Sequence, residues 1–355
     1  MGERRPVLLT VSGTIPDDLD EQVAAGRRPR ADYRVLADRV DADVVDVAAA
    51  LAATGRIGRV LHRLGGAGPL LAWYVFRRRR RYQVVLTDGE QVGIPLALLM
   101  RMLGTGGLRH VMIVHVLSVP KKARVLRWAR LAPLIGRYVV YCTAQAEWIE
   151  RQLGVPPTRI VVTPFMVDTT FFGLGAVDVP RRRMICSAGL ERRDYPTLMA
   201  AVDGLDVEVV IAAASPWSKQ PDSSRATVVP TNVTIERFDL HALRELYAAS
   251  QFVVMPLVDV DFQAGITTIL EAMAMERAVI CTRTQGQNDT ILEGVTGWYV
   301  SPADSEELRA AIVRLLGDPP RSNGLGEAAR NWVEEHAAIE RYADVIEGVV
   351  RSATD

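Results

Sequence analysis

Residues 263–287 read QAGITTILEAMAMERAVICTRTQGQ, in which a small-residue turn leads into a helical stretch and then into a β-branched strand. The turn Gln263-Ala264-Gly265 follows another apolar run, FVVMP at 252–256. This order of strand, loop, helix and strand is the repeating unit of parallel α/β sheets. Small residues let the backbone approach a ligand closely, and the free N–H groups at a helix start favour phosphate.

Short β-branched runs alternate with helical stretches along the whole chain. The runs are continuously apolar, which is typical of parallel strands covered on both faces. The predicted strands are residues 6–12, 43–47, 83–87, 111–116, 138–142, 159–163, 183–189, 207–213, 252–256, 278–282 and 297–300. Because 355 residues exceed what one hydrophobic core usually supports, the pattern predicts an α/β protein with two Rossmann-like, doubly wound domains.

The division between the domains is predicted near FMVDTTFFGLGAVDVP at 165–180, which is rich in turn formers and lacks helical periodicity. We therefore expect an N-terminal domain at 1–170, a C-terminal domain at 171–336, and a helix at 337–355 that packs back toward the N-terminal domain. Two such domains facing one another form a central cleft, and ligands of these sheets lie outside the carboxyl ends of the strands.

Composition excludes several classes of protein. The cysteines Cys142, Cys186 and Cys281 stand alone in apolar runs, which argues against disulfides, and the five histidines lack metal-ligand spacing. No stretch offers the roughly 18 apolar residues of a membrane span, and the N-terminus does not resemble a secretory signal. We expect a cytoplasmic protein that holds no metal.

The net charge of zero conceals an asymmetry between the two halves of the chain. Residues 1–140 contain 23 Lys and Arg against 12 Asp and Glu, and residues 141–355 contain 19 against 30. Between Leu51 and Arg137 the only acidic residues are Asp88 and Glu90. Halves of opposite charge predict two domains with different partners.

Glu271 lies one to two turns into the helix that follows the quoted turn. A carboxylate at this position can accept two hydrogen bonds from a vicinal diol such as ribose. With the turn, it predicts a nucleotide-diphosphate site without a P-loop, since the chain contains no GxxxxGK[ST] motif. The alternative is that Glu271 caps the helix or is solvated.

A longer segment around this helix resembles a known family. Residues 252–304, FVVMPLVDVDFQAGITTILEAMAMERAVICTRTQGQNDTILEGVTGWYVSPAD, resemble the donor site of the family 4 glycosyltransferases, which are retaining enzymes of the GT-B fold. EGVTGWYVSPAD at 293–304 matches the last element of that site well. Weaker matches lie upstream at RIVVTPFMVDTTFF (159–172), VMIVHV (111–116) and GLERRDYPTLMAAV (189–202).

The resemblance implies transfer of a hexose-type sugar from a nucleotide-diphosphate sugar to a hydroxyl acceptor, without cofactor or metal. The leaving diphosphate itself would help to deprotonate the acceptor hydroxyl. The implied catalytic residues are His115, Arg193 and Gln263. The implied donor-binding residues are Arg192, Arg193, Gln263, Ala264, Gly265, Ile266, Thr267 and Glu271.

Three positions depart from the family pattern. Gln263 stands where the family has a glutamate, so it brings no negative charge, and sugar preference or activity is in question. Glu276 replaces a usual glycine, and Gln285-Gly286-Gln287 replaces a Gly-Gly pair.

His115 matches the histidine near the reacting carbon, although a histidine ending a buried strand is also often a structural hydrogen-bonding group.

The acceptor is expected in the basic half. Gly13 and Thr14 follow the first strand, and Asp88 and Glu90 follow another, so these four residues are acceptor-contact candidates; the alternative for the two acids is simple solvation. From the resemblance we expect the acceptor to be a lipid-linked or small molecule.

Two basic segments, WYVFRRRRRY (73–82) and KKARVLRWARLAPLIGR (121–137), suggest peripheral contact with an anionic membrane. In the second segment we place the cations on one helical face and Val125, Ala129 and Ala132 on the other, with Trp128 and Leu131 intruding on the basic side. The alternative is a buried helix with solvated or paired arginines. No nucleic-acid recognition module is present.

Two rival functions fit the same architecture. A nucleotide-sugar epimerase or hydrolase would need an acid–base set that the sequence does not offer. A non-catalytic nucleotide-sugar-binding protein is suggested by Gln263 and by the imperfect cation pair at Arg192 and Arg193.

Overall fold

The computed structural model describes residues 5–213 and 229–354, which divide into two compact units. The first unit comprises residues 1–21, 31–164 and 340–355, and the second comprises 22–30 and 165–339. The main crossing thus lies at Pro164–Phe165, six residues before the predicted boundary of 170. The C-terminal segment groups with the first unit rather than forming a body of its own.

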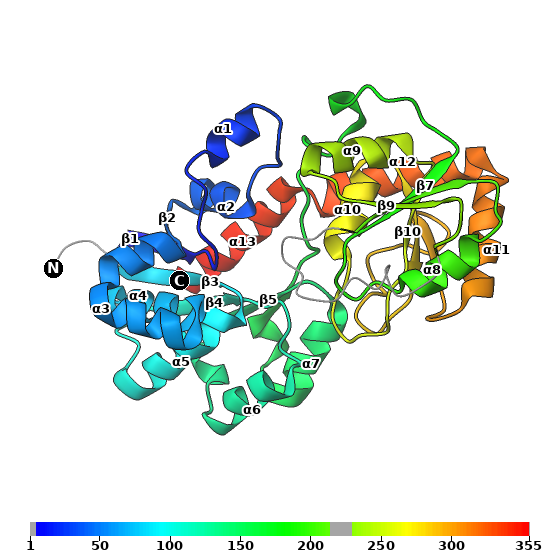
Figure 1. Cartoon of the computed structure of the whole chain (residues 1–355). Helices are drawn as coiled ribbons and strands as arrows, with labels where there is room; N and C mark the ends of the chain where they lie inside the picture. The colour runs from blue at the N-terminus through cyan, green and yellow to red at the C-terminus, as the bar shows by residue number, and fades with distance from the viewer. Residues whose placement is uncertain (1–4, 214–228, 355) are drawn as a thin grey trace. The chain divides into compact units, whose positions relative to one another are not determined.

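The first unit contains a six-stranded parallel sheet of order β2-β1-β3-β4-β5-β6 (Figure 1). Its strands are β1 (Arg5–Thr10), β2 (Ala42–Val45), β3 (Tyr82–Asp88), β4 (Arg109–Ile113), β5 (Arg137–Val140) and β6 (Ile160–Val162). Its helices are α1 (Leu19–Ala24), α2 (Asp32–Val40), α3 (Val47–Gly65), α4 (Ala67–Arg78), α5 (Glu90–Leu103), α6 (Pro120–Trp128), α7 (Thr143–Leu153) and α13 (Ile339–Thr354). Helix α1 begins in this unit and ends in the second.

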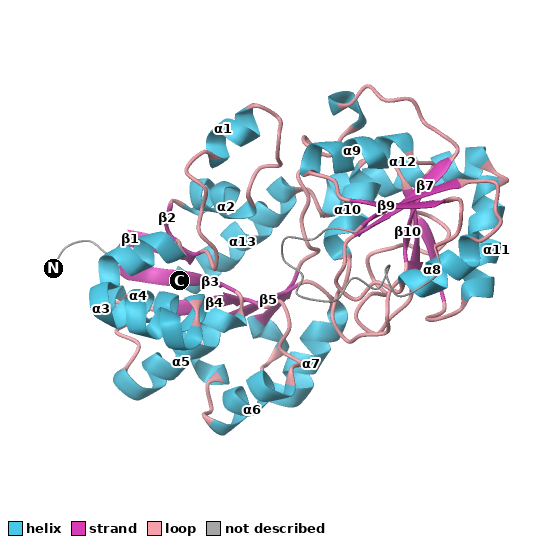
Figure 2. Cartoon of the chain, in the orientation of Figure 1, coloured by secondary structure: helices cyan, strands magenta, loops and turns pink. Residues whose placement is uncertain are grey.

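Connection handedness assigns these helices to two layers. The chain steps from β2 through β3, β4 and β5 in one direction along the sheet, and right-handed crossovers therefore put α3, α4, α5 and α6 on one face. The step from β1 to β2 runs the other way, which puts α2 on the opposite face. Figure 2 shows α2 and α13 on one side of these strands and α3 to α6 on the other.

The second unit contains another six-stranded parallel sheet, of order β12-β11-β10-β7-β8-β9. Its strands are β7 (Met184–Ala188), β8 (Glu208–Ala212), β9 (Val233–Glu236), β10 (Phe252–Met255), β11 (Ala278–Thr282) and β12 (Gly297–Val300). Its helices are α8 (Tyr195–Val202), α9 (Leu240–Ala249), α10 (Ile266–Ala274), α11 (Ser305–Leu316) and α12 (Pro319–His336). When these strands are numbered 1 to 6 in chain order, the sheet has the order 3-2-1-4-5-6, which is that of dinucleotide-binding folds.

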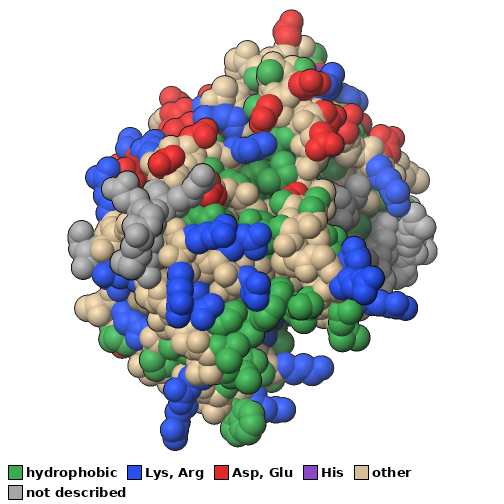
Figure 3. Space-filling model, turned by 90° about the vertical axis from the view of Figure 1, so that its left-hand side faces the viewer, with side chains coloured by type: hydrophobic (Ala, Val, Ile, Leu, Met, Phe, Trp, Pro, Cys, Tyr) green, Lys and Arg blue, Asp and Glu red, His purple; other side chains and the backbone are tan. Residues whose placement is uncertain are grey.

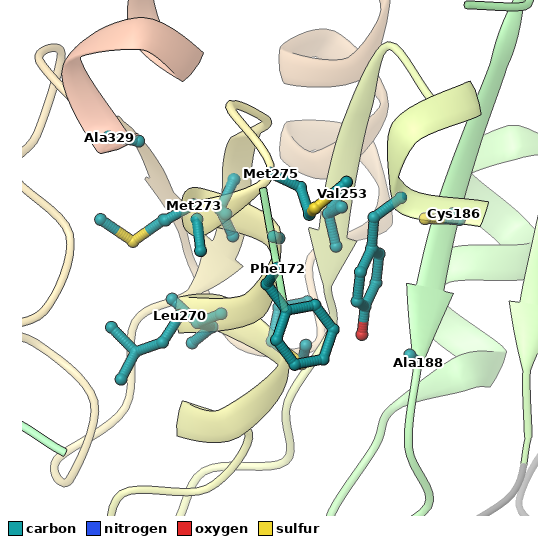
Figure 4. Packing of buried hydrophobic residues seen from close by; sticks show 14 of the residues in the cluster. Phe172, Cys186, Ala188, Val253, Leu270, Met273, Met275 and Ala329 are labelled. Carbon is teal, nitrogen blue, oxygen red and sulfur yellow. The ribbon is translucent and has the colours of Figure 1, made fainter. Parts of the chain in front are cut away.

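Alternate residues along the strands of the second unit point to opposite faces of the sheet and pack into two separate hydrophobic cores. Cys186 and Val253 face the core that α9, α10 and α12 cover, whereas Ile185 and Val254 face the core under α8 and α11. Figure 4 shows the first of these cores, with Phe172 lying among side chains of α10 and β10. Both faces of the sheet are thus buried, as the continuously apolar runs predicted.

Two predictions about elements were wrong. The short strand β9 was missed because its residues alternate between buried and exposed at the sheet edge and include Thr234 and Glu236. The helix predicted through 121–137 ends at Trp128, because Arg130 adopts a positive φ and Pro133 follows.

That early ending also changes the faces of the helix. Ala123 and Leu126 form its buried side, whereas Val125 and Trp128 are exposed. Leu131, which lies beyond the helix end, is fully buried.

Phe172 gives a direct test of the core beneath α10. Its ring contacts Phe171 edge-on at 4.9 Å between centroids and Tyr247 at 6.4 Å, and only 2% of it is exposed. Phe172→Ala should lower the free energy of unfolding of the second unit by about 3–5 kcal/mol, because it leaves a cavity. Urea denaturation measures this, and Leu240→Ala, at a half-exposed position on α9, should change it by less than about 1 kcal/mol.

Candidate functional site

The strand order of the second sheet reverses between β7 and β10. These neighbouring strands lead into crossovers that run in opposite directions along the sheet. Open α/β sheets bind ligands outside the carboxyl ends of their strands at such a reversal point. Arg193 lies in the loop after β7, and Gln263 to Gly265 lie in the loop after β10.

The side chain of Arg193 is buried at this reversal point. Its Nε donates to the carbonyl of Ala188 at 2.8 Å, Nη1 to that of Glu191 at 2.6 Å, and Nη2 to Oγ1 of Thr268 at 3.5 Å. A Cβ atom added at Gly189 would lie 2.5 Å from Nη2, and one added at Gly265 would lie 3.4 Å from Nη1. The two glycines thus let the guanidinium lie against the end of β7 and the start of α10.

Helix α10 begins with open donors. Its N-cap residue Gly265 has a φ of 77°, a conformation that glycine adopts without strain, and no side chain among the described residues caps the helix. The first N–H groups of Ile266 and Thr267 therefore point out of the helix start, where the partial positive charge of the helix dipole lies. This geometry suits an anion.

Glu271 lies in the second turn of α10 and is buried. The hydroxyl of Tyr247, on α9, donates to its Oε2 at 3.0 Å. Burial raises the pKa of Glu271 to about 7, although the hydrogen bond from Tyr247 and the charge of Arg193 act in the opposite direction. The predicted ribose contact thus lies on the same helix whose first turn faces the reversal point.

The amide of Gln263 is only half satisfied. Its Nε2 donates to Oγ1 of Thr290 at 3.1 Å, while its buried Oε1 has no hydrogen-bond partner among the described residues. Nearby Gln287 is completely buried, and its Nε2 likewise lacks a partner there. Two amides with unused hydrogen-bonding capacity therefore adjoin Thr290.

The remaining predicted donor residues differ in exposure. Arg192 is exposed and adopts a positive φ of 55°, so it stands apart from the buried Arg193 although it precedes it directly. Ala264 is buried, and its N–H donates to the carbonyl of Phe262. Of the predicted cation pair, the structure therefore brings Arg193 to the start of α10 and leaves Arg192 at the surface.

The first sheet has its own reversal point, between β1 and β3. Gly13 and Thr14 lie in the exposed loop after β1, and Asp88 ends β3. Ser12 joins the two loops, because its Oγ donates to the carbonyl of Asp88 at 3.0 Å and accepts from Gln91 at 3.1 Å. Three of the four predicted acceptor contacts thus share one edge of this sheet.

His115 lies two residues beyond the end of β4 and pairs with Asp88. Its Nε2 is 3.0 Å from Oδ1 of Asp88, and each side chain is a little more than one-third exposed. Burial opposes the imidazolium, but the hydrogen bond and charge of Asp88, followed by the charges of Glu90 and Asp32, outweigh it and raise the pKa of His115. The pair therefore favours the protonated imidazole.

Glu90 organises the loop that carries His115. Its buried carboxylate accepts from the backbone N–H groups of His115 at 3.0 Å and Val116 at 3.3 Å, and from Nζ of Lys122 at 2.6 Å. These hydrogen bonds are typical of a positioning residue, and the role of Glu90 as an acceptor contact stays a prediction.

The sequence patterns missed four residues around His115. Burial and the neighbouring charge of Asp88 raise the pKa of Asp32, the first residue of α2, to about 6. Gln145 donates to the carbonyl of His115 at 2.6 Å, and the Tyr141 ring lies 5.7 Å from the imidazole. Tyr342, on α13, reaches the Tyr141 hydroxyl at 3.4 Å. These residues come from distant segments, and no local motif marks them.

Comparison with known proteins identifies the second unit. The sequence profile described as glycosyl transferases group 1 matches residues 192–318, which include Arg193, the start of α10 and Glu271. Over these residues the second unit is similar to the group 1 glycosyltransferases. The recognition made from residues 252–304 is confirmed.

Solved structures show the fold of the whole chain. HepE of Anabaena, solved with UDP-glucose, aligns with a TM-score of 0.70 at 14% identity, over 98% of this chain and 99% of that one. Sucrose-phosphate synthase of Thermosynechococcus elongatus aligns at 0.72 with 16% identity, over the same shares. The predicted α/β, GT-B fold class is confirmed.

Curated relatives match smaller parts of the chain. Alpha-D-kanosaminyltransferase of Streptomyces kanamyceticus is 30% identical over 152 residues, which are 42% of this chain and 38% of that protein. The chain spans between 16% and 55% of the length of the curated relatives it matches. Their likeness thus supports the family of the second unit more than any one activity.

Glu271 predicts a pH dependence of stability. Its pKa rises from 4.5 in the unfolded chain to about 7 in the folded one, so between these values the folded state holds the extra proton. Stability is therefore fully present below about pH 4.5 and falls as the pH rises through about 7, by roughly 3 kcal/mol. Glu271→Gln lacks this titration. Denaturant unfolding from pH 5 to 8 should therefore show that the free energy of unfolding falls more with pH in the wild type than in Glu271→Gln. The same pH dependence in both proteins would contradict the prediction.

The His115–Asp88 pair predicts a titration shift. Asp88→Asn removes the charge and hydrogen bond that support the imidazolium, so the pKa of His115 should fall below that in the wild type. NMR titration of the imidazole resonances measures it. Asp344→Asn, on α13, is the control and should leave the pKa of His115 unchanged. If Asp88→Asn also leaves that pKa unchanged, a group other than Asp88 stabilises the imidazolium.

Proposed function

We propose that the chain is a retaining, family 4 glycosyltransferase that moves a hexose-type sugar from a nucleotide-diphosphate sugar to a hydroxyl acceptor. The observation that carries the proposal is the meeting of a buried guanidinium and an uncapped helix start at the reversal point of the second sheet. A diphosphate is an anion that both features would bind. The group 1 glycosyltransferase match over the same residues supports it.

In this proposal each part of the donor meets a different group. The N–H groups of Gly265, Ile266 and Thr267 and the Arg193 guanidinium bind the diphosphate, with Arg192 approaching from the exposed side. The ionised carboxylate of Glu271 accepts from the ribose hydroxyls, for which it must lose its proton. Gln263 presents the unused capacity of its amide to the sugar hydroxyls.

Bond cleavage is then driven by stabilisation of the leaving group. The bond between the anomeric carbon and the diphosphate oxygen breaks, the acceptor oxygen forms the new bond on the same face, and the acceptor proton passes to the leaving diphosphate. Arg193 and the start of α10 stabilise the charge that develops on that diphosphate. Cationic groups of the chain suffice for this task, and the proposal includes no metal ion and no cofactor.

The first unit provides the acceptor side of the proposal. Gly13, Thr14 and Asp88 line the acceptor subsite, Glu90 fixes its loop, and His115 lies near the reacting carbon. The acceptor is a lipid-linked or small-molecule hydroxyl. The proposed location is the cytoplasm, with peripheral contact at the inner face of the membrane.

One observation favours a second function. Gln263 replaces a family carboxylate by a neutral amide, which fits a protein that binds a nucleotide sugar without transferring it. HepE was solved with UDP-glucose, so a nucleotide-sugar ligand suits either function. The two functions differ only in turnover.

A binding panel tests the donor site first. Thermal shifts with UDP, GDP, ADP, TDP and their common sugars should reveal one preferred nucleotide. Glu271→Ala should weaken its binding by roughly tenfold or more, since a carboxylate–diol contact involves charged hydrogen bonds. Glu327→Ala, an exposed glutamate on α12, is the matched control and should bind like the wild type.

Turnover with the preferred donor then separates the functions. Transfer to a hydroxyl acceptor with retained anomeric configuration, read by NMR, supports the proposal. Donor binding without turnover on lipid-linked and small-molecule acceptors indicates a binding protein, and sugar release without acceptor indicates a hydrolase. Absence of binding to every nucleotide would overturn the donor site itself.

A further inference from the structure

The outer surface of helices α3, α5 and α6 exposes large apolar side chains. Leu64 is 82% exposed, Met102 70% and Trp128 89%. These helices form one layer on a single face of the first sheet, as argued from the crossover directions. We call this surface the α3–α6 face; its exposed apolar residues are Ile57, Val60 and Leu64 on α3, Leu98, Met102 and Leu103 on α5, and Val125 and Trp128 on α6.

The same face is strongly basic. In Figure 3, Lys and Arg side chains lie among hydrophobic ones over the lower half of the view, while acidic side chains gather toward the top. The exposed cations of α3 to α6 and their connections are Arg56, Arg59, Arg63, Arg77, Arg80, Arg81, Arg101, Lys121, Arg124, Arg127 and Arg130. Within residues 5–213 and 229–354, no ion pair to any of these eleven is found.

The acids of this region cannot neutralise the face. Between Leu51 and Arg137 the chain contains only Asp88 and Glu90. Glu90 is buried against Lys122, and Asp88 pairs with His115 at the edge of the sheet. The positive charge of the α3–α6 face is therefore left to an external partner.

We propose that the α3–α6 face docks on the surface of an anionic lipid bilayer. Cations near such a surface each strengthen binding roughly fivefold at low salt. Exposed aliphatic side chains enter the boundary between headgroups and acyl chains, and an exposed tryptophan prefers that same depth. No helix in the described part of the chain could cross a bilayer, so the contact is peripheral.

The apolar side chains decide between lipid and nucleic acid. A phosphate backbone would use the arginines but has no use for Leu64 or Met102, which would stay exposed to water. The aromatic side chains of α4 are also engaged, since Arg78 lies 3.8 Å over the Tyr74 ring and Arg79 lies 3.9 Å over Phe76. A lipid surface uses both kinds of side chain at once.

Co-sedimentation with vesicles tests the proposal on the full chain. Vesicles of phosphatidylcholine alone are compared with vesicles that contain one part in three phosphatidylglycerol. We expect binding to the anionic vesicles only, weakening steeply between low and high salt. The readout does not depend on glycosyl transfer, so it stands or falls separately from the proposed activity.

Two variants separate the contributions of charge and apolar contact. Leu64→Ser/Met102→Ser/Trp128→Ser should weaken binding by at least about tenfold, because three inserted side chains are lost. Arg59→Gln/Arg63→Gln/Arg124→Gln/Arg127→Gln should weaken it by roughly 600-fold at low salt, since each cation contributes about fivefold. Val295→Ser/Val313→Ser, at positions of the second unit that are about half exposed, is the control and should bind like the wild type. Unchanged nucleotide thermal shifts or circular dichroism confirm that each variant is folded.

The outcomes are distinct. Loss of vesicle binding in both α3–α6 variants, with the control unaffected, supports a lipid-binding face. Failure of the wild type to bind anionic vesicles overturns the proposal. So does binding to RNA or duplex DNA that the serine variant retains in full, because the face would then act through charge alone.

Discussion

A buried arginine joins the two halves of the second sheet at the point where its strand order reverses. Arg193 extends from the loop after β7, donates back to the end of that strand, and lies against the first residues of α10. Taking a guanidinium out of water is costly unless its donors are satisfied. Its hydrogen bond to Thr268 ties the loop after β7 to the first turn of α10. Backbone hydrogen bonds from Asp194 to Pro256 and from Val258 to Arg192 join the same loop to the one after β10.

In the first unit a buried carboxylate, rather than a buried guanidinium, holds a loop at the edge of the sheet. Glu90 is buried at the start of α5, and its carboxylate holds the backbone of the loop after β4. That loop carries His115, which in turn pairs with Asp88 from the end of β3. In both units a buried charged side chain holds backbone groups at the sheet edge, so the chemistry at each edge depends on a buried neighbour.

How much of this could be predicted depends on whether the signal is local. Parallel strands, the small-residue turn at Gly265 and the carboxylate of Glu271 lie within one short stretch, and the sequence predicts them together. Arg192 and Arg193 look equivalent in sequence, and only backbone conformation separates them: a positive φ turns one outward while the other is buried. Asp32, Tyr141 and Tyr342 meet through topology alone, and no pattern could have paired them. The faces of α6 were misjudged because Arg130 and Pro133 end the helix early.

Helix α13 has a consequence for the order in which the protein is completed during synthesis. Glu340–Asp355 belongs to the first unit, although the whole second unit lies between it and the rest of that unit. The hydroxyls of Tyr141 and Tyr342 meet across 201 positions of sequence, and Arg109 reaches the carbonyl of Ala353 across 244. Contacts of such separation form late, because loop closure over long distances costs entropy before the contact repays it. As the chain leaves the ribosome, all strands of the first unit emerge before those of the second, yet one face of the first sheet stays partly uncovered until the last helix emerges.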